Sequence, residues 1–214
     1  MDESFWNEKW KNNEIAFHEN DANPSLVKHF KEFSLAKGSR VFLPLCGKTR
    51  DIAWLLSNEY RVAGAELSEI AIDQLFMELG IKPAITEFSK LKHYNAKYID
   101  IFGGNIFHLT DKLLGAGDMI YDRAALVALP AAMRNQYTVH LTQITGKAPQ
   151  LLISYEYDQT INEGPPFSVI NEEIMLQYSG SYNIRLLAST DLPGGMKGKC
   201  PAKENIWFLQ RKNT

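Results

Sequence analysis

The stretch RVFLPLCGKTRDIAWLLSNEYRVAGAELS, residues 40–68, decides the fold of this chain. An apolar run is followed by a tight turn with one glycine, a helical segment over 51–56 and a second apolar run that ends at Glu66. This order predicts two parallel strands of an α/β domain. Glu66 follows Gly47 by nineteen residues. The spacing places a carboxylate at the end of the second strand, where it can accept hydrogen bonds from ribose hydroxyls. An adenosine-containing ligand is therefore expected.

The rest of the chain alternates between strand-like and helix-like apolar periodicity. Predicted strands lie at 41–43, 60–66, 97–102, 118–122, 150–155, 183–188 and 205–210. Predicted helices lie at 4–12, 24–33, 51–56, 69–79, 130–145 and 171–177, with Asn23, Ser68 and Asn171 as N-caps. The pattern predicts a three-layer α/β sandwich, in which a mostly parallel twisted sheet of about seven strands is covered on both faces. The helix-free connection before the last strand predicts an antiparallel C-terminal edge.

Composition predicts one ordinary globular domain. With 214 residues, 45% of them hydrophobic, the chain is expected to form a single domain over 1–214. Residues 1–36 would be a helical N-terminal cover and 37–214 the α/β core. The net charge of −2 gives no electrostatic case for a nucleic-acid or membrane partner. No apolar run approaches the ~20 residues of a spanning helix, and no signal peptide is visible.

Cysteines and histidines give no sign of a metal site. The chain has two cysteines, too few for a disulfide framework, and its five histidines show no metal-ligand spacing. A reducing, cytoplasmic setting is predicted. Nothing in the sequence requires a protein partner or more than a monomer.

The first turn, Pro44–Lys48, narrows the choice of cofactor. It lacks the G-x-G-x-x-G fingerprint of nicotinamide and flavin sites, and the chain has no G-x-x-x-x-G-K-[ST] motif for a nucleoside triphosphate. An adenosine cofactor without phosphate fits better, and S-adenosylmethionine is the one expected. The alternative is an ordinary strand–turn–helix with no ligand.

Several strings, in order along the chain, carry a family resemblance. They are FWNEKW (5–10), AFH (16–18), VFLPLCGK (41–48), GAELSE (64–69), DIF (100–102), YDRAALVALP (121–130) and GPPF (164–167). With these strings the chain resembles the thiopurine S-methyltransferase family, including its bacterial members, over nearly its whole length. The resemblance implies a class I methyltransferase fold, which is Rossmann-like. It also implies transfer of the methyl group of S-adenosylmethionine to sulfur or a related soft atom, with S-adenosylhomocysteine as the product.

The resemblance assigns cofactor contacts to the α/β core. Leu45 and Gly47, in the first turn, would lie against the methionine part of the cofactor. Glu66 would bind the ribose hydroxyls. Asp100 and Ile101, expected at the end of a later strand, would flank the adenine, with Ile101 as an apolar face and Asp100 as a hydrogen-bond acceptor.

Two further pairs are implied by the same resemblance. Trp6 and Trp10, one helical turn apart, would cover the cofactor; alternatively they only fasten the extension to the core. Arg123 would lie near both cofactor and acceptor at the end of the fourth parallel strand, where a guanidinium can bind a carboxylate with two hydrogen bonds. Asp122 would orient Arg123. The alternative for this pair is a purely structural role.

The acceptor pocket is expected to be apolar and aromatic, because a heteroaromatic thiol needs few polar contacts. Phe17 and the stiff loop Gly164–Phe167, especially Pro166 and Phe167, are the candidates, and Lys197 is a candidate positive charge. In-line transfer from a sulfonium needs positioning more than base catalysis. The small-molecule acceptor would be a thiopurine-like thiol or a tellurium or selenium species. The alternatives are a halide, thiocyanate or nitrogen acceptor, or a binding module without turnover.

Overall fold

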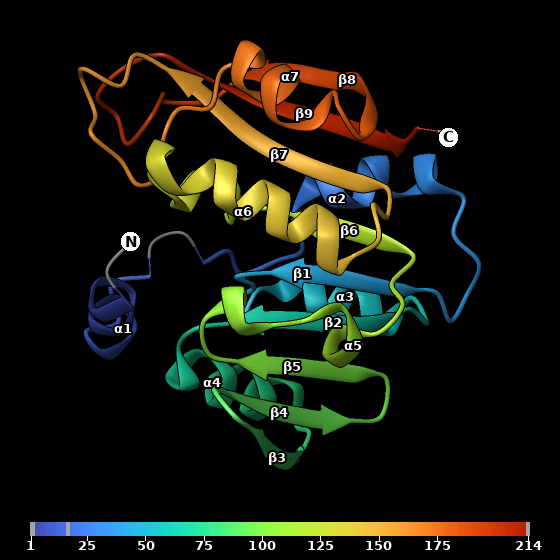
Figure 1. The fold of residues 1–214 in the computed structure, drawn as a ribbon. Coiled ribbons are helices and arrows are strands. Elements are labelled where there is room, and N and C mark those ends of the chain that lie inside the picture. Colours follow the sequence, from blue (N-terminus) through green and yellow to red (C-terminus); the bar gives the residue numbers. More distant parts are fainter. Residues whose placement is uncertain (1–2, 16–17, 213–214) are drawn as a thin grey trace. The chain divides into compact units, whose positions relative to one another are not determined.

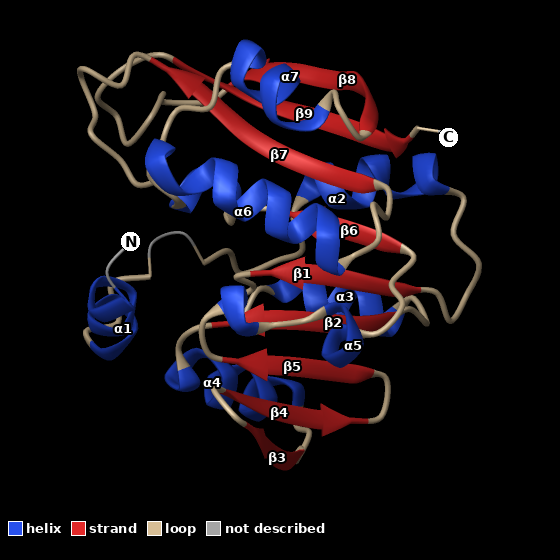
Figure 2. Cartoon of the chain, viewed as in Figure 1, coloured by secondary structure: helices blue, strands red, loops and turns tan. Residues whose placement is uncertain are grey.

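The computed structural model describes residues 3–15 and 18–212 (Figure 1). The chain divides into two compact units, Met1–Met119 and Ile120–Thr214. They are called unit 1 and unit 2. In both, strands and helices alternate along the chain, as the sequence pattern predicts (Figure 2).

In unit 1, neighbouring strands follow the order β3-β4-β5-β2-β1. Their bounds are β1 Arg40–Pro44, β2 Arg61–Glu66, β3 Ala84–Phe88, β4 Leu91–Ala96 and β5 Ile99–Gly103. Strands β1, β2 and β5 are parallel, with Pro44 opposite Ala65 and Glu66 opposite Gly103. The carboxyl ends of these three strands therefore meet at one edge, where ligands of open α/β sheets bind. Strand β4 is antiparallel to β5, and β3 is antiparallel to β4.

The helices of unit 1 begin and end largely where the sequence predicts. Their bounds are α1 Glu3–Lys11, α2 Pro24–His29, η1 Phe30–Phe33, α3 Arg50–Ser57, α4 Glu69–Leu79, η2 Ile106–His108 and α5 Asp111–Leu114. The predicted N-cap Asn23 is confirmed, because its side chain accepts from the N–H groups of Ser25 and Leu26 at 2.9 and 3.3 Å. Gly80, with a φ of 67°, ends α4 as predicted.

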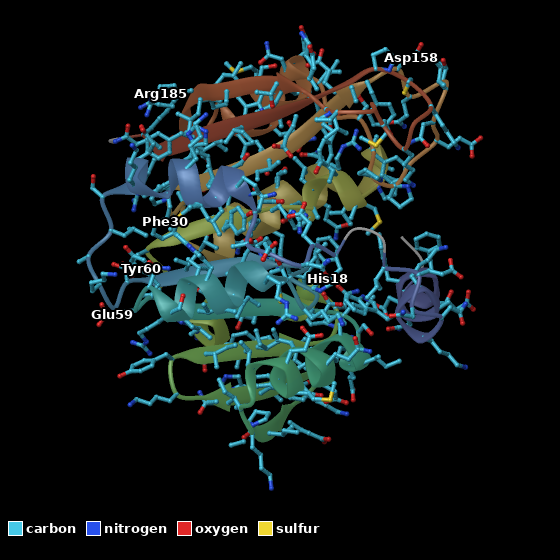
Figure 3. The ribbon with its side chains drawn as sticks, turned by 180° about the vertical axis from the view of Figure 1, so that it is seen from behind. His18, Phe30, Glu59, Tyr60, Asp158 and Arg185 are labelled. Atoms are coloured by element: carbon cyan, nitrogen blue, oxygen red, sulfur yellow. The ribbon has the colours of Figure 1, made fainter. Side chains whose placement is uncertain are left out.

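Aromatic and polar contacts attach the N-terminal segment to α3. The Phe30 ring lies 4.7 Å from the Tyr60 ring and 5.4 Å from the Trp54 ring, measured between centroids (Figure 3). The fully buried Asp51 accepts a hydrogen bond from the backbone N–H of Asn23 at 2.7 Å. Burial of Phe30 together with this buried hydrogen bond stabilises the packing of α2 and η1 on α3.

Unit 2 combines one parallel and two antiparallel strand pairs. The bounds are β6 Met119–Asp122, β7 Gln150–Tyr157, β8 Tyr182–Asp191 and β9 Ala202–Arg211, with helices η3 Leu126–Ala128, α6 Ala131–Ile144 and α7 Asn171–Tyr178. Strands β6 and β7 are parallel, and β9 pairs antiparallel with both β7 and β8. The predicted antiparallel C-terminal edge is therefore confirmed. The N-cap of α7 is Ile170 and not Asn171, which is the first helical residue.

The strand count differs from the expected seven because β3 and β4 occupy a stretch for which no strand was predicted. They add a second antiparallel edge, beside β5, to the one expected at the C-terminal end. Among residues 3–15 and 18–212, no helix combines the length and apolar character that crossing a bilayer requires.

Candidate functional site

The turn after β1 contains two residues in the left-handed conformation. Leu45 has a φ of 47° and Gly47 a φ of 52°. Glycine adopts this conformation freely, whereas it costs a leucine about 1–2 kcal/mol. The Cys46 N–H donates to the Ala65 carbonyl at 3.0 Å, which joins the turn to the end of β2. The strained conformation places the backbone of Leu45 at the carboxyl end of β1, and strain of this kind is common in binding turns.

Glu66, at the end of β2, links that turn to the start of α4. Its Oε2 accepts from the Gly47 N–H at 2.7 Å, and its Oε1 accepts from the Ser68 N–H at 2.8 Å. The side chain is 5% exposed. Burial raises the pKa of Glu66, and the N–H groups of Ser68, Gly47 and Leu67 partly oppose that shift. Each carboxylate oxygen has a second acceptor position, so the group can also bind ribose hydroxyls.

The two tryptophans of α1 lie in different surroundings. Trp10 is 4% exposed and covers Gly47, since a Cβ at Gly47 would lie 3.0 Å from Trp10 Cζ2. The half-buried Trp6 packs edge-on against Phe5 of the same helix, with centroids 5.2 Å apart. Only glycine at position 47 gives both the positive φ and the room for the indole ring. Trp10 thus closes over the turn, as expected of a residue that covers a ligand there.

Asp100 is the second and Ile101 the third of the five residues of β5, so their expected place at the strand end is wrong. The strand continues to Gly103, which is opposite Glu66, whereas Asp100 is opposite Ala63. Three residues of strand extend about 10 Å. Ile101 is fully buried in the core of unit 1. The assigned contacts with adenine remain predictions, and the strand geometry favours residues nearer the carboxyl end.

Three polar side chains bind the Asp100 carboxylate. The Arg40 guanidinium lies 3.1 Å away, His93 Nε2 lies 2.9 Å away, and Asn95 Nδ2 donates at 2.6 Å. Burial acts to raise the pKa of Asp100, but the hydrogen bonds from Asn95 and His93 and the charge of Arg40 outweigh it, so the pKa is lowered. Because Arg40 begins β1, these contacts join the first residues of two strands. The geometry indicates a structural role for Asp100.

The carboxyl end of β5 is formed instead by Gly104, Asn105 and Ile106. The Gly104 N–H donates to the Glu66 carbonyl at 2.8 Å, which brings the ends of β5 and β2 together. Asn105 Nδ2 donates to Glu3 Oε1 at 2.7 Å and so attaches the start of α1, while Ile106 is 6% exposed. The sequence analysis missed these residues. The Gly-Gly pair directly after an apolar strand was the available signal, because it marks a strand end.

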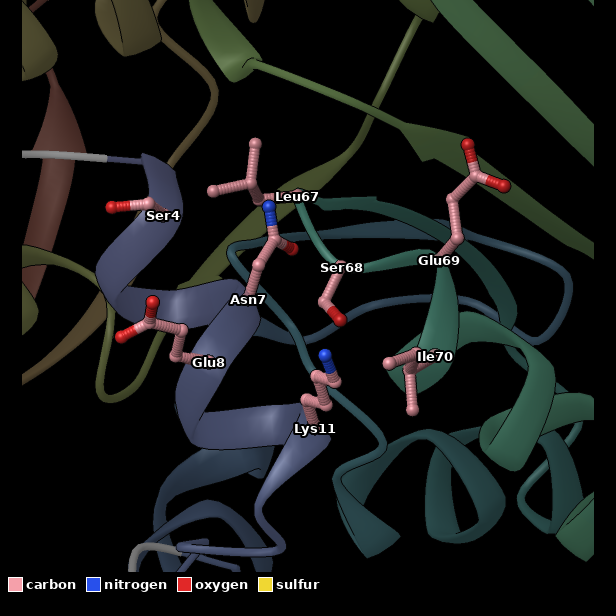
Figure 4. Close-up of a pocket in the computed structure, with 8 residues that line it drawn as sticks. All are labelled: Ser4, Asn7, Glu8, Lys11, Leu67, Ser68, Glu69 and Ile70. Carbon is pink, nitrogen blue, oxygen red and sulfur yellow. The ribbon is translucent and has the colours of Figure 1, made fainter.

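An open cavity of about 540 Å³ lies beside the residues that follow Glu66 in unit 1 (Figure 4). It is lined by Ser4, Asn7, Glu8 and Lys11 of α1 and by Leu67, Ser68, Glu69 and Ile70 of the β2–α4 connection. The volume falls within the ~300–1,000 Å³ range of small-molecule sites. One wall of the cavity is a face of α1, and the other is the segment that follows Glu66. Such walls suit a nucleoside-sized ligand.

In unit 2, Asp122 ends β6 and organises the loop that follows Arg123. The carboxylate is fully buried, and it accepts from Tyr137 Oη at 2.7 Å and from the Leu126 N–H at 3.0 Å. Burial raises the pKa of Asp122 to about 6. Arg123 is half-buried, and Ala124 has a φ of 62°. Asp122 therefore fixes the loop that carries Arg123 through the backbone N–H of Leu126.

Two hydrogen bonds hold the backbone of the loop Gly164–Phe167. The Phe167 N–H donates to the Val127 carbonyl at 2.6 Å, and Tyr157 Oη donates to the Pro166 carbonyl at 2.5 Å. The ring of Phe167 lies over residue 164, where a Cβ would be 2.6 Å from it. Since Val127 belongs to the loop that follows Arg123, the proline-rich loop and the arginine loop form one connected structure within unit 2.

Lys197 also contacts this proline-rich loop, because its Nζ donates to the Pro165 carbonyl at 2.7 Å. If the acceptor is a thiol, as the resemblance implies, Lys197→Met should raise its KM about threefold, because one hydrogen bond to the loop is lost. The affinity for S-adenosylhomocysteine should not change. Lys199→Met, an exposed lysine of the same segment, is the control. A much larger loss for carboxylated than for neutral thiols would show instead that Lys197 binds the acceptor by its charge.

Other candidates contribute less to the site. Phe17 lies outside the described residues. Cys46 is buried, and burial raises the pKa of its thiol well above the usual value, which is typical of a structural cysteine. Gly64 leaves room for that thiol, since a Cβ there would lie 2.8 Å from Cys46 Sγ. Within the part of the chain that the structure describes, no group of histidines, cysteines or carboxylates could hold a metal ion.

Solved structures with a similar fold are S-adenosylmethionine-dependent methyltransferases. One from Anabaena variabilis matches with a TM-score of 0.63 at 14% identity, covering 98% of this chain and 95% of that chain. The 1,6-didemethyltoxoflavin-N1-methyltransferase of Burkholderia thailandensis, solved with S-adenosylhomocysteine, matches with a TM-score of 0.67 at 13% identity, covering 98% and 87%. The predicted fold class, that of the class I methyltransferases, is therefore confirmed.

Relatives with much higher identity settle the family. The family model described as thiopurine S-methyltransferase (TPMT) matches residues 1–212. The thiopurine S-methyltransferase of Xanthobacter autotrophicus is 50% identical over 212 residues, covering 99% of this chain and 100% of that protein. The protein of the same name from Gluconobacter oxydans is 46% identical over 203 residues, covering 95% and 92%. The chain belongs to the thiopurine S-methyltransferase family and is a methyltransferase with S-adenosylmethionine as its cofactor.

Proposed function

We propose that the enzyme methylates the sulfur of a small heteroaromatic thiol, such as a thiopurine, and that tellurium or selenium species are further acceptors. The observation that carries the proposal is the loop Gly164–Phe167. It presents an aromatic ring on a stiff segment that is hydrogen-bonded to the loop after Arg123. A flat heterocycle suits such a wall, because aromatic rings stack on apolar and aromatic surfaces. The names of the relatives point to the same acceptor class.

The residues of unit 1 fit the cofactor on their own geometry. Glu66 has acceptor capacity left beyond its two backbone hydrogen bonds. Gly47 leaves room for the Trp10 indole, which packs against the turn where the methionine part is expected. The cavity beside the residues that follow Glu66 would take the adenosine part, with Leu67 and Ile70 near the base. Glu66, Gly47, Trp10 and Leu45 are the residues that we assign to the cofactor.

Methyl transfer requires the protein to align the reacting atoms and to exclude water from them. S-adenosylmethionine, when bound, supplies the methyl group: the acceptor sulfur forms the new carbon–sulfur bond, the sulfonium bond breaks with its electron pair on the departing sulfur, and a thiol proton leaves to solvent. Arg123 would stabilise a thiolate or an anionic ring by its charge. Asp122 would hold the arginine loop in position through Leu126.

A two-stage experiment tests this function. Calorimetric titration should show saturable binding of S-adenosylhomocysteine and none of NAD. Labelled methyl transfer should then be measured with 6-mercaptopurine, its oxygen counterpart hypoxanthine, selenite, tellurite, iodide, thiocyanate and a small amine. Transfer to the thiol but not to hypoxanthine is expected. Transfer only to halide, thiocyanate or nitrogen would replace the proposal, and cofactor binding without any transfer would indicate a binding module.

Arg123→Lys tests whether the arginine acts through its geometry. Lysine keeps the charge but loses the planar pair of donors, so kcat/KM for the thiol should fall about tenfold. Arg211→Lys, an exposed position at the end of β9, is the matched control. Steady-state kinetics of both variants decide the point. An unchanged kcat/KM in Arg123→Lys would leave charge alone as the role of Arg123.

A further inference from the structure

The hydroxyl of Ser68 is buried without a hydrogen-bond partner among the described residues. Ser68 is 1% exposed and precedes the first residue of α4, but its side chain makes no capping hydrogen bond. Serine at this position normally accepts a hydrogen bond from an N–H of the first helical turn. Because nearly all buried polar groups are paired, an unpaired one in a folded protein calls for an explanation.

Ser68, which carries this buried hydroxyl, is part of the wall of the cavity described above. Ser68 is one of the lining residues, together with Leu67 and Ile70 on its own segment and Asn7 and Lys11 on α1. In Figure 4 the Ser68 side chain points into the space between α4 and α1, toward Lys11. Lys11 is exposed, and its long side chain can rotate away from the hydroxyl when a ligand enters.

Ser68 is also connected to the proposed ribose-binding carboxylate. The Ser68 backbone N–H donates to Glu66 Oε1 at 2.8 Å. The residue that carries the hydroxyl therefore also holds one oxygen of the Glu66 carboxylate in place. The N-terminus of α4, an 11-residue helix, begins at the same point. A hydroxyl both donates and accepts, which allows it to pair with a ribose hydroxyl or with a ring nitrogen of the base.

We propose that Ser68 Oγ is a hydrogen-bond partner of the adenosine part of the bound cofactor. The inference rests on the proposed placement of adenosine in the cavity beside Glu66. It explains why a serine at a capping position makes no cap: its hydroxyl remains available to a ligand. Leu67 and Ile70 provide the apolar surface next to it, as expected where a base packs.

Ser68→Ala separates this role from a structural one. The affinity for S-adenosylhomocysteine should fall about five- to tenfold, and the affinity for adenosine alone should fall by the same factor. The melting temperature of the ligand-free protein should stay within about 2 °C, since the hydroxyl has no protein partner to lose. Ser57→Ala is the control, because the Ser57 hydroxyl makes an ordinary local hydrogen bond to Trp54 at 2.8 Å.

Two results would overturn the proposal. One is an affinity within twofold of the wild type, and the other is a larger fall in melting temperature, which would identify Ser68 as a helix cap whatever the affinity does. Both titrations are made on the full chain well below its melting temperature. The test is independent of methyl transfer. If no thiol is methylated, the proposed function fails while the result for Ser68 still stands.

Discussion

Glu66→Ala is expected to weaken binding of S-adenosylhomocysteine by about 10- to 100-fold. Two ribose hydrogen bonds to a charged group are lost, together worth roughly 1.5–3 kcal/mol. The change also leaves the N–H groups of Gly47 and Ser68 without their acceptor, so the turn loses one of its two contacts with the end of β2. Calorimetric titration of the folded variant measures the affinity, and thermal unfolding measures the accompanying loss of stability.

A comparison of nucleosides isolates the ribose contact from general damage to the turn. If Glu66 binds the ribose hydroxyls, adenosine should lose affinity in the variant, whereas 2′,3′-dideoxyadenosine should bind variant and wild type equally weakly. Glu87→Ala, an exposed glutamate of β3, is the matched control. Equal losses for both nucleosides would assign Glu66 a structural role, and unchanged adenosine affinity would remove it from the site.

The sequence predicted the strand–turn–helix–strand region closely because its signals are local. Strand β1 ends at Pro44, α3 covers Arg50–Ser57 and β2 ends at Glu66, all within a few residues of the prediction. An apolar strand, a turn glycine and a helical period occur in direct succession there. Each local preference agrees with the global fold, so pattern reading is sufficient.

The apolar pattern of the sequence did not predict β3 and β4, because few of their side chains are buried. All five residues of β3 are exposed, and in β4 only Leu91 and Tyr94 are buried. Such strands are held by backbone hydrogen bonds at the edge of a sheet, and they carry no apolar alternation that a sequence would show. Tertiary pairing therefore decided the structure of this stretch.

The sequence placed Asp100 and Ile101 wrongly for a related reason. Asp100 pairs with Arg40, sixty positions away in the chain, and its place in β5 follows from the register with β2. The contact of Lys197 with the Pro165 carbonyl likewise joins distant segments. Sequence spacing correctly placed Glu66 at the end of β2, because that position follows from one short unit, but it could not locate partners brought together by the fold.

Asp122→Asn is expected to remove a large pH-dependent contribution to stability. The pKa of Asp122 is about 6 in the folded protein and ~3.9 in an unfolded chain. A carboxyl whose pKa is raised by folding stabilises the protein fully below pH ~4, and that contribution is lost as the pH rises through about 6. A difference of about two pKa units corresponds to ~3 kcal/mol. Asparagine does not titrate, so the variant should lack this term.

The measurement is the free energy of unfolding in urea between pH 4 and 8 for both proteins. The stability of the wild type relative to Asp122→Asn should fall by roughly 2 kcal/mol across this range, with most of the change between pH 4 and 6. Asparagine can still accept from the Leu126 N–H and donate to Tyr137 Oη, so the loop after Arg123 should keep its hydrogen bonds. A constant difference would mean that Asp122 ionises in the folded protein as easily as in water.

Asp158→Asn provides a control of opposite sign. Hydrogen bonds from the Thr160 side chain and backbone lower the pKa of the exposed Asp158. Its contribution is present above its unfolded pKa and is lost as the pH falls through the folded pKa, the reverse of Asp122. With the urea measurement extended below pH 4, the stability of the wild type relative to Asp158→Asn should rise with pH up to about pH 4, whereas its stability relative to Asp122→Asn should fall between pH 4 and 6. Parallel profiles for the two variants would show that burial of Asp122 does not control its ionisation.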